Sequence, residues 1–458
     1  MNEQSVWYFT APWDPVLIRR GDALGFRAGA DYFADLLAPG LSNSTTDARW
    51  ISILSWCLKW SHRAWQNAGG SDLSRRDEQR ARYAWLRPLE LLWVARALES
   101  GQKTGQLRGR LSIERWRKAG RASSNFAMSP DQFRRYRQVG MYGAYRVVLR
   151  VPGLTTGDGW TPAETSLKLA RLVNDRLPSR VRLNEEDFGN GTQWGYWSKE
   201  KQVEYWIRHG WAEWSQSSNR GLLPLPDEAI RKRLAEEEER SLLESALFGD
   251  GSVRRVTAEV LANAKCAKHV DLCDALSNSS TLAKRLVSVS LAPLPAFSSF
   301  ADEAMHAMRV LWTEINHDGE KQAPTVEKLA RSTELKVGLE QLRAAGNAWL
   351  SAPGRSAFPH EHIVTQLAEA MGKATTPSDQ VRMLSAHHHE YGGGRRWFRE
   401  ESGKLVPLVA NTGIAASDYR FRLRSLCLLA AQCGVARMDN ALNAMAREPE
   451  DDEEKDYA

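Results

Sequence analysis

The sequence predicts a mainly α-helical, multidomain protein with a winged-helix-like insert and short β-hairpins. Apolar residues recur every three or four positions in several long stretches, as they do from Trp50 to Trp60. This is the period of a helix with one buried face. The chain has 458 residues, which is more than one hydrophobic core usually serves. Glycines at 157, 159 and 403 lie between short extended segments and are typical of tight hairpin turns.

The N-terminal half is expected to hold four long helices, over 28–37, 46–65, 72–98 and 131–151. Pro39-Gly40 ends the first of them, because neither residue continues a helix easily. Ser129-Pro130 precedes the last, since Ser suits a helix cap and Pro the first turn. The segment 101–121 alternates glycines with basic residues and predicts a linker that runs into a short helix.

The C-terminal half is also expected to be helical. Helices are predicted at 163–176, from near Pro226, twice within 253–290, and at 301–315, 325–350, 360–371, 417–433 and 438–446. Pro293 and Pro295 predict a linker at 291–300. Gly392-Gly393-Gly394 should end a helix, and a hairpin that turns at Ser402-Gly403 should follow it.

These elements predict five parts of the chain. Fifteen of the 18 Trp lie between Trp7 and Trp214, so the N-terminal half should be densely packed, and the five Trp of 188–214 are assigned to packing rather than base stacking. Seven acids fall within 448–458, too polar to bury a core. The parts are a Trp-rich helical domain (1–124), a winged-helix-like basic module (125–180), a helical middle region (181–292), a C-terminal helical domain with the GGG hairpin (293–447) and an acidic disordered tail (448–458).

Residues 141–170 carry the winged-helix prediction. The stretch "MYGAYRVVLRVPGLTTGDGWTPAETSLKLA" passes from a helical pattern through a glycine-rich turn to a second helix. Gly157-Asp158-Gly159 suits the positive backbone angles of a tight hairpin, and Thr161-Pro162 suits a helix start. This order resembles the wing region of winged-helix proteins. A helical connector with an incidental hairpin is the alternative.

Basic residues are concentrated in one segment. Residues 75–150 contain 18 Lys and Arg against six Asp and Glu, a net charge of +12. The whole chain has a formal charge of +6, because the tail 448–458 is acidic. A localised basic excess is the footprint of a surface that binds a polyanion. We therefore predict nucleic acid as a partner, with a merely solvated arginine-rich surface as the alternative.

The candidate nucleic-acid contacts are basic residues of this segment, one neighbouring tyrosine and two arginines beside the glycine run. They are Arg115, Arg117, Lys118, Arg121, Arg134, Arg135, Tyr136, Arg137, Arg146, Arg395 and Arg396. Phosphate contacts give affinity but little sequence information. The expected ligand is therefore DNA, in duplex form and bound with weak sequence preference.

The motifs of common catalytic sites are missing. The chain has no GxxxxGK[ST] phosphate cradle, no HExxH, no paired CxxC and no GxSxG elbow, which hydrolases and nucleotide-driven motors use. We predict no catalytic residue, no metal and no cofactor, and expect that the protein is not an enzyme. A metal-dependent nuclease is the runner-up, because Asp318, Glu334 and Lys336 follow the acid and acid-x-lysine order of such enzymes. Their segment has a helical pattern, whereas those nucleases place the pair on a strand.

Five of the ten histidines lie between His360 and His389. His387, His388 and His389 are consecutive and cannot all reach one metal from a helix, where ligands need a spacing of three or four. A structural role is favoured for this region. Alternatively, the amides of Gly392 to Gly394 beside Arg395 and Arg396 would receive a phosphate.

Cellular location is predicted from what the sequence lacks. No apolar run approaches the roughly 20 residues that span a bilayer, and the N-terminus has no signal-peptide pattern. The five cysteines are odd in number and lie in apolar or helical contexts, which is typical of a reducing compartment. A cytoplasmic protein without membrane contact is expected.

Two regions carry a family resemblance. The stretches "FADLLAPGLSNSTTDARW", and "HHHEYGGGRRWF" with "YRFRLRSLCLLAAQCGV", resemble a poorly characterised family of bacterial proteins. That family is associated with multigene anti-phage defence loci, beside helicase-, phospholipase-D-like or methyltransferase-type genes. The resemblance covers roughly 50 residues and implies a component of a defence complex, but no catalytic residue.

These observations predict a non-catalytic DNA-binding or scaffolding subunit of a bacterial anti-phage defence complex. Catalysis would come from partner subunits such as a helicase or nuclease. Besides the nuclease, a third hypothesis is a protein-interaction adaptor. In that case the Trp-rich half would dock a partner, and the arginines would only solubilise the protein.

Overall fold

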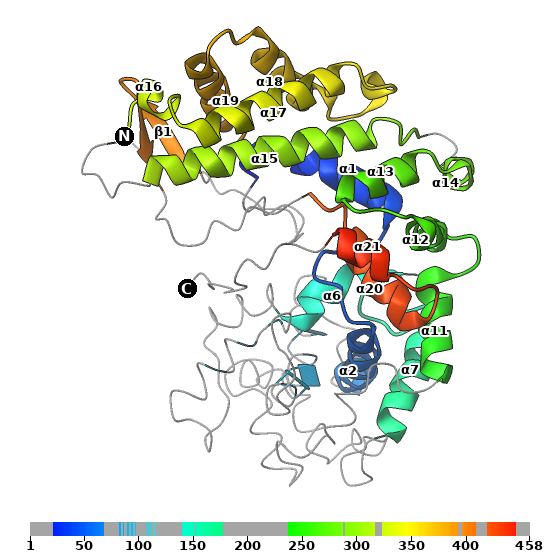
Figure 1. Cartoon of the computed structure of the whole chain (residues 1–458). Coiled ribbons are helices and arrows are strands. Elements are labelled where there is room, and N and C mark those ends of the chain that lie inside the picture. The colour runs from blue at the N-terminus through cyan, green and yellow to red at the C-terminus, as the bar shows by residue number, and fades with distance from the viewer. Residues whose placement is uncertain are drawn as a thin grey trace, which may run out of the picture. The chain divides into compact units, whose positions relative to one another are not determined.

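The computed structural model describes residues 22–67, 140–151, 153–176, 237–286, 289–316, 323–392, 396–408 and 419–445, with scattered positions between 82 and 114. Within these ranges the protein is mainly helical, as the sequence predicts (Figure 1). The chain divides into two compact units. The first comprises Met1–Phe33 and His269–Phe421, and the second Ala34–Lys268 and Arg422–Ala458. Each unit is thus assembled from segments that lie far apart in the sequence.

The first unit is a stack of helices with one hairpin. Long helices α15 and α17 lie side by side, α18 packs on α17, and α19 packs on α18 (Figure 1). Their bounds are α13 (His269–Ser277), α14 (Ser280–Arg285), α15 (Leu294–Asn316), α16 (Val326–Leu329), α17 (Thr333–Leu350), η5 (Arg355–Ala357), α18 (Glu361–Lys373) and α19 (Pro377–Tyr391). The division between the units falls within α1 (Arg27–Leu37).

Aromatic rings fill the core of the first unit. The rings of Phe33 and Phe358 stack with centroids 5.1 Å apart, and Phe297 lies 5.4 Å from each of them. Trp349 of α17 meets Phe297 edge to face at 6.2 Å. Such offset and edge-on pairs add stability beyond the burial of their area. The core therefore joins α1 to α15 and α17, which follow it by more than 250 residues.

The hairpin consists of β1 (Phe398–Glu401) and β2 (Lys404–Pro407), paired antiparallel with Glu401 opposite Lys404. Ser402 and Gly403 form the turn with φ of 51° and 74°, the positive values that a tight two-residue hairpin requires. The predicted turn is confirmed. β2 packs on α15, and β1 on α19.

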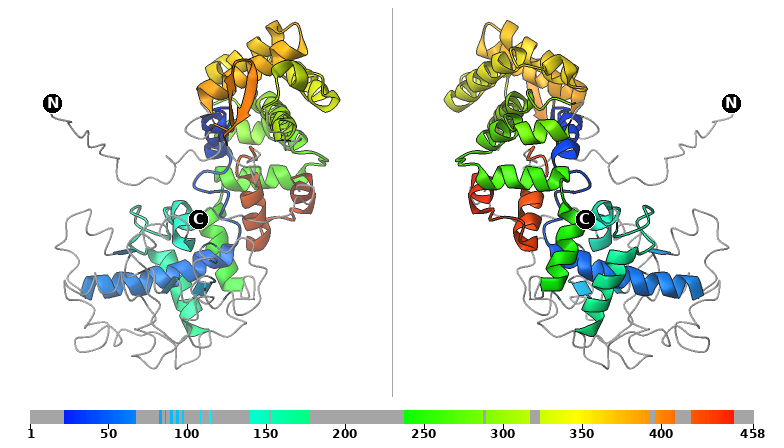
Figure 2. Two further views of the ribbon diagram at one scale, coloured as in Figure 1. Left: turned by 90° about the vertical axis from the view of Figure 1, so that its left-hand side faces the viewer. Right: turned by 90° about the vertical axis from the view of Figure 1, so that its right-hand side faces the viewer.

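The second unit is built around two crossing helices. α2 (Ala48–Asn67) and α7 (Glu164–Asp175) pack together, and both views of Figure 2 show α7 crossing α2. Trp56 of α2 donates its indole N–H to Asn174 of α7 at 3.0 Å. The other helices are α6 (Met141–Leu149), α11 (Glu237–Phe248), α12 (Val253–Asn263), α20 (Leu423–Cys433) and α21 (Asp439–Ala444).

A buried ionic cluster holds three helices of this unit together. The Glu239 carboxylate of α11 is fully buried and pairs with Arg49 of α2 and with Arg176, which follows α7. Burial alone raises the pKa of a carboxyl, but the two guanidinium groups outweigh it and hold the pKa of Glu239 below its usual value. Removing one member of such a cluster leaves an uncompensated buried charge. Glu239 belongs to the acidic run "EEEERS", a composition typical of a solvated face, so the sequence gives no sign of this contact.

Several predicted boundaries need correction. The helix expected over 131–151 does not pass through Gly140, which is extended, and α6 starts at Met141. Glycine has a low helix propensity, which favours a helix boundary at Gly140. Glu90 then accepts the backbone N–H of Tyr142, in the first turn of α6, at 3.2 Å. The described part of 253–290 holds three helices, α12, α13 and α14, where two were expected. The expected linker at 291–300 is largely the first turns of α15, where proline is tolerated because those amides need no partner.

The helix expected over 325–350 is divided into α16 and α17. Ser332 caps α17, because its hydroxyl accepts the backbone N–H of Leu335 at 3.3 Å. The helix expected from 417 begins only at Leu423, since Phe421 and Arg422 have positive φ values of 48° and 59°.

Three predicted features lie outside the described residues: the Trp-rich stretch 188–214, the helix start near Pro226 and the tail 448–458. The predicted domain boundaries stay predictions.

The cysteines and the apolarity of the helices were also used to predict the protein's location. All five cysteines lie in the described part of the chain and none forms a disulfide; four of them are buried. Burial raises the pKa of the Cys273, Cys427 and Cys433 thiols to about 12, so these side chains serve as apolar packing. In the part of the chain that the structure describes, no helix combines the length and apolarity needed to span a membrane.

Candidate nucleic-acid interface

The loop between α6 and α7 contains the predicted wing. Thr155 and Pro162 form an isolated antiparallel bridge, and Thr156 donates its N–H to the carbonyl of Thr161 at 3.0 Å. Gly157 and Gly159 have φ of 96° and 79°, as the turn prediction requires. The described loop is therefore a tight, closed hairpin-like turn with a single bridge in place of paired strands.

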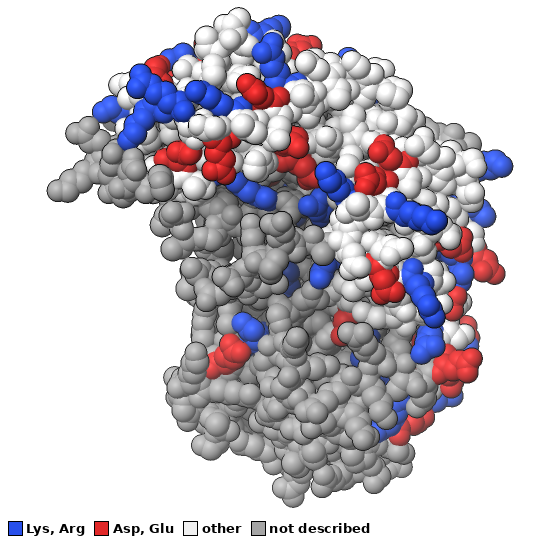
Figure 3. Space-filling model, viewed as in Figure 1, with Lys and Arg blue, Asp and Glu red and all other residues white. Residues whose placement is uncertain are grey.

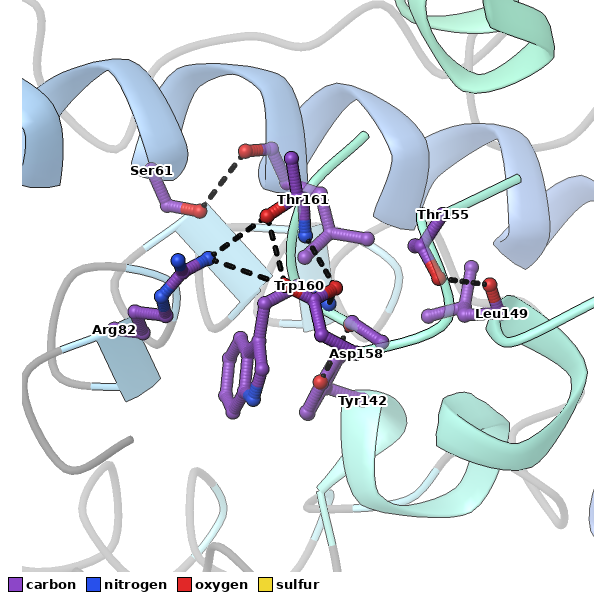
Figure 4. A network of polar contacts seen from close by, with 10 residues as sticks. Ser61, Arg82, Tyr142, Leu149, Thr155, Asp158, Trp160 and Thr161 are labelled. Atoms are coloured by element: carbon purple, nitrogen blue, oxygen red, sulfur yellow. Dashed lines mark hydrogen bonds and ion pairs between the residues drawn. The ribbon is translucent and has the colours of Figure 1, made fainter. Parts of the chain in front are cut away.

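Asp158 organises the tip of this loop. Its Oδ1 accepts the backbone N–H groups of Trp160 at 2.7 Å and Thr161 at 2.8 Å, and its Oδ2 accepts the Thr161 hydroxyl at 2.8 Å (Figure 4). Partial burial raises the pKa of this carboxyl, but the hydrogen bonds from Thr161 and Trp160 outweigh it, so the pKa ends below its ordinary value. The carboxylate is thus held in its charged form as a structural acceptor.

Arg82 closes the network from another part of the chain. Its guanidinium donates to the Thr161 hydroxyl at 3.2 Å and lies 3.7 Å from Asp158 Oδ2 (Figure 4). The same group covers the ring of Trp65 at 3.9 Å from the centroid. Its side chain is only 10% exposed. This arginine of the basic segment is therefore committed to holding the loop.

Aromatic side chains anchor the base of the loop. Tyr142 and Trp160 stack at 4.5 Å, and the Tyr142 hydroxyl donates to the carbonyl of Gly159 at 2.7 Å. Burial raises the pKa of Tyr142 well above its usual range, so this hydroxyl stays protonated. Only Thr156, Gly157 and Asp158 are exposed at the tip. Arg150, at the C-terminus of α6, is an exposed cation beside the loop and was not among the predicted contacts.

Most of the predicted nucleic-acid contacts lie outside the described residues. This applies to Arg115, Arg117, Lys118, Arg121, Arg134, Arg135, Tyr136, Arg137 and Arg395. Of the other two, Arg146 is on the buried side of α6 with 8% exposure, which leaves little area for a phosphate. Arg396 is exposed.

Other arginines of the 75–150 segment also have partners within the protein. Arg108 donates to the hydroxyl of Ser44 at 2.9 Å, and Arg110 lies 3.5 Å from Glu114. With Arg82 and Arg146, four described arginines of this segment are in intramolecular contacts or buried. The charge count of the sequence therefore overstates the charge available to a ligand, because it cannot separate structural arginines from surface ones.

The histidine-rich end of α19 is a structural junction in the first unit. His388 donates from Nδ1 to the carbonyl of Ala23 at 2.7 Å, and its Nε2 accepts the backbone N–H of Trp397 at 2.9 Å. His387 donates from Nε2 to the carbonyl of Leu24 at 2.9 Å. Both ring nitrogens of His388 are engaged, so its neutral Nδ1–H tautomer is the form that fits. The favoured structural role agrees with these contacts.

The glycine run is described only at its first residue. Gly392 donates its N–H to the carbonyl of His388 at 2.8 Å, so this amide is not available to a phosphate. A Cβ at this position would collide with the carbonyl oxygen of His388, which explains the need for glycine. Gly393, Gly394 and Arg395 lie outside the described residues, and the phosphate-binding alternative for them stays a prediction.

The described residues bear on metal binding and on the nuclease alternative. Among the described residues, no three His, Cys, Asp or Glu side chains are grouped to hold a metal ion. Glu334 and Lys336 lie in the first turns of α17, so their helical context is as predicted. Asp318 lies outside the described residues.

The comparisons with known proteins identify no relative. No family model, curated protein or solved structure matches the chain.

Proposed function

We propose that the protein is a non-catalytic DNA-binding or scaffolding subunit of a bacterial anti-phage defence complex, working in the cytoplasm with a helicase or nuclease as its catalytic partner. The observation that carries the proposal is the basic excess. Outside the acidic tail, 61 basic residues stand against 49 acidic ones. A surface of this charge attracts the phosphate backbone irrespective of base sequence.

The location of the DNA contacts is narrowed by the described arginines. Arg82, Arg108 and Arg110 have partners inside the protein, so we assign the contacts to other basic residues. These include the run Arg134, Arg135 and Arg137, and the exposed Arg150 and Arg396. The defence role rests on the sequence resemblance alone.

The proposal is tested by DNA binding at several salt concentrations. The full chain should bind a labelled duplex of about 30 base pairs, with a logarithmic affinity that falls linearly with the logarithm of salt, because bound phosphates release counterions. Replacing Arg134, Arg135 and Arg137 together by Ala should weaken binding and reduce that slope by up to about three. An affinity that stays constant between about 50 and 200 mM salt would contradict the electrostatic basis.

The nuclease alternative has its own test. Wild-type protein incubated with supercoiled plasmid and Mg²⁺ or Mn²⁺ should leave the plasmid intact. Nicking that disappears in Asp318→Ala or Glu334→Ala would replace the proposal by the nuclease. The adaptor alternative would be supported if the protein bound no nucleic acid but captured a defence subunit stoichiometrically.

A further inference from the structure

We propose that α16, α17 and the β1–β2 hairpin form a winged helix-turn-helix surface that places the first turns of α17 in the major groove of duplex DNA. This inference rests on the proposed function and adds a second DNA contact to the residues assigned there. The surface lies in the first unit, and the winged element predicted for 141–170 stays a prediction.

The connection between α16 and α17 has the length of the turn in a helix-turn-helix motif. α16 ends at Leu329, three residues follow, and α17 begins at Thr333. The motif joins two helices through a turn of three to four residues. Val326 and Leu329 of α16 and Leu335 of α17 are buried, and both helices pack on α15 and α19. The turn is fixed further by Ser332, whose hydroxyl donates to Glu314 of α15 at 2.7 Å.

The hairpin takes the position of a wing. Thr325, directly before α16, forms an antiparallel bridge with Lys404 of β2. Val326 donates its N–H to the carbonyl of Gly403 at 3.1 Å, and Leu405 donates to the carbonyl of Pro324 at 3.0 Å. The chain order is thus helix α15, a strand-like residue, helix-turn-helix and, after the inserted α18 and α19, a hairpin that pairs with the strand-like residue.

The hairpin is also anchored from behind. Trp397, just before β1, is buried and meets Trp312 of α15 at 6.0 Å, and Leu405 of β2 is fully buried. The wing and the two helices are therefore parts of one packed body. A recognition element held this way reaches DNA with little loss of conformational freedom.

The exposed face of α17 carries the groups that read DNA. Arg331 in the turn and Lys336 in α17 are exposed, and the structure gives neither an acidic partner within 4 Å among the described residues. Val337 is 49% exposed and offers an apolar contact of the kind that thymine methyl groups accept. Figure 3 shows basic side chains gathered over α16 and the start of α17. In helix-turn-helix proteins it is this start of the second helix that contacts base edges.

Charge balance predicts how this surface binds. Glu327, Glu334 and Glu340 lie among the basic residues, so the surface is not strongly positive. Arg382 on neighbouring α19 is already paired with Glu327 and Asp379. We therefore expect few phosphate contacts here, with the remaining affinity supplied elsewhere on the chain.

The test compares two charge reversals of equal size in the full-length protein. Arg331→Glu with Lys336→Glu changes the proposed surface, whereas Lys284→Glu with Arg285→Glu changes two exposed residues of α14 in the same unit. Binding to a duplex of about 30 base pairs is measured by fluorescence anisotropy across salt concentrations. The first pair should weaken binding at least about tenfold more than the second and reduce the salt slope by about two. Unchanged thermal unfolding confirms that each variant folds.

Cross-linking to photoreactive DNA, mapped by mass spectrometry, locates the contact directly. Adducts within 326–343 and the hairpin support the inference. The inference would be wrong if the wild type binds tightly, both variant pairs weaken binding equally and the adducts are confined to 75–150. The proposed function would then still stand. A wild-type protein that does not bind duplex DNA at low salt overturns both. Loss of a co-purifying protein partner in the first pair alone, without a change in DNA binding, would reassign this face to protein contact.

Discussion

Some single residues of this protein have structural roles that their residue type alone does not predict. His388 joins Ala23 to Trp397, two residues more than 370 positions apart, through its two ring nitrogens. Nearby, Gly25 has φ of 74°, and a Cβ there would lie 2.8 Å from the Cβ of Tyr391. The close approach of the segment before α1 to the end of α19 thus depends on a neutral histidine and a glycine.

Acid should destabilise the protein through His387. Burial lowers the pKa of this histidine from 6.5 to about 4. Below pH 6.5 the unfolded chain takes up a proton that the folded one does not, so stability falls as the pH is lowered towards 4. The loss should reach about 2 to 3 kcal/mol by pH 4.5. Urea unfolding at pH 7 and pH 4.5, compared with His387→Gln, checks this. A wild-type stability that changes no more than that of the variant would refute it.

At the scale of elements, the loop between α6 and α7 depends on one carboxylate. Asp158 accepts three hydrogen bonds from Trp160 and Thr161 and lies beside Arg82. Asp158→Ala should therefore destabilise the protein by about 1 to 2 kcal/mol, since each lost bond to a charged acceptor costs a part of that. Thr156→Ala, an exposed position at the same tip, is the control and should change little. Equal stabilities of the two variants in urea unfolding would show that the network is dispensable.

At the scale of the whole molecule, the acidic tail should compete with DNA. Residues 448–458 carry seven acids and one lysine, and the rest of the chain is basic. Deleting the tail should tighten binding to duplex DNA at low salt, with the difference shrinking as salt rises, because screening weakens both interactions. Anisotropy titrations of the full-length and truncated proteins measure this. Equal affinities at about 20 mM salt would assign the tail a solubilising role only.

The sequence by itself determined the elements that depend on local chemistry. The helical class, the helix α2, the Ser402-Gly403 hairpin turn and the helical context of Glu334 and Lys336 all follow from apolar period, capping and backbone preference. Boundaries failed where a tertiary contact intervened. After Gly140 the carboxylate of Glu90 accepts the backbone N–H of Tyr142. The Ser332 hydroxyl, which donates to Glu314, caps the amide of Leu335 and divides a continuous helical pattern.

Only the tertiary structure decided which charged side chains are paired inside the protein. Glu239, part of an acidic run, is buried between Arg49 and Arg176, and Arg82 is held by the loop it supports. It also brought Thr325 beside Lys404, which defines the proposed wing. Composition and periodicity report what each segment does alone. Pairing between residues 63 to 190 positions apart depends on how whole faces pack, and no local pattern carries that information.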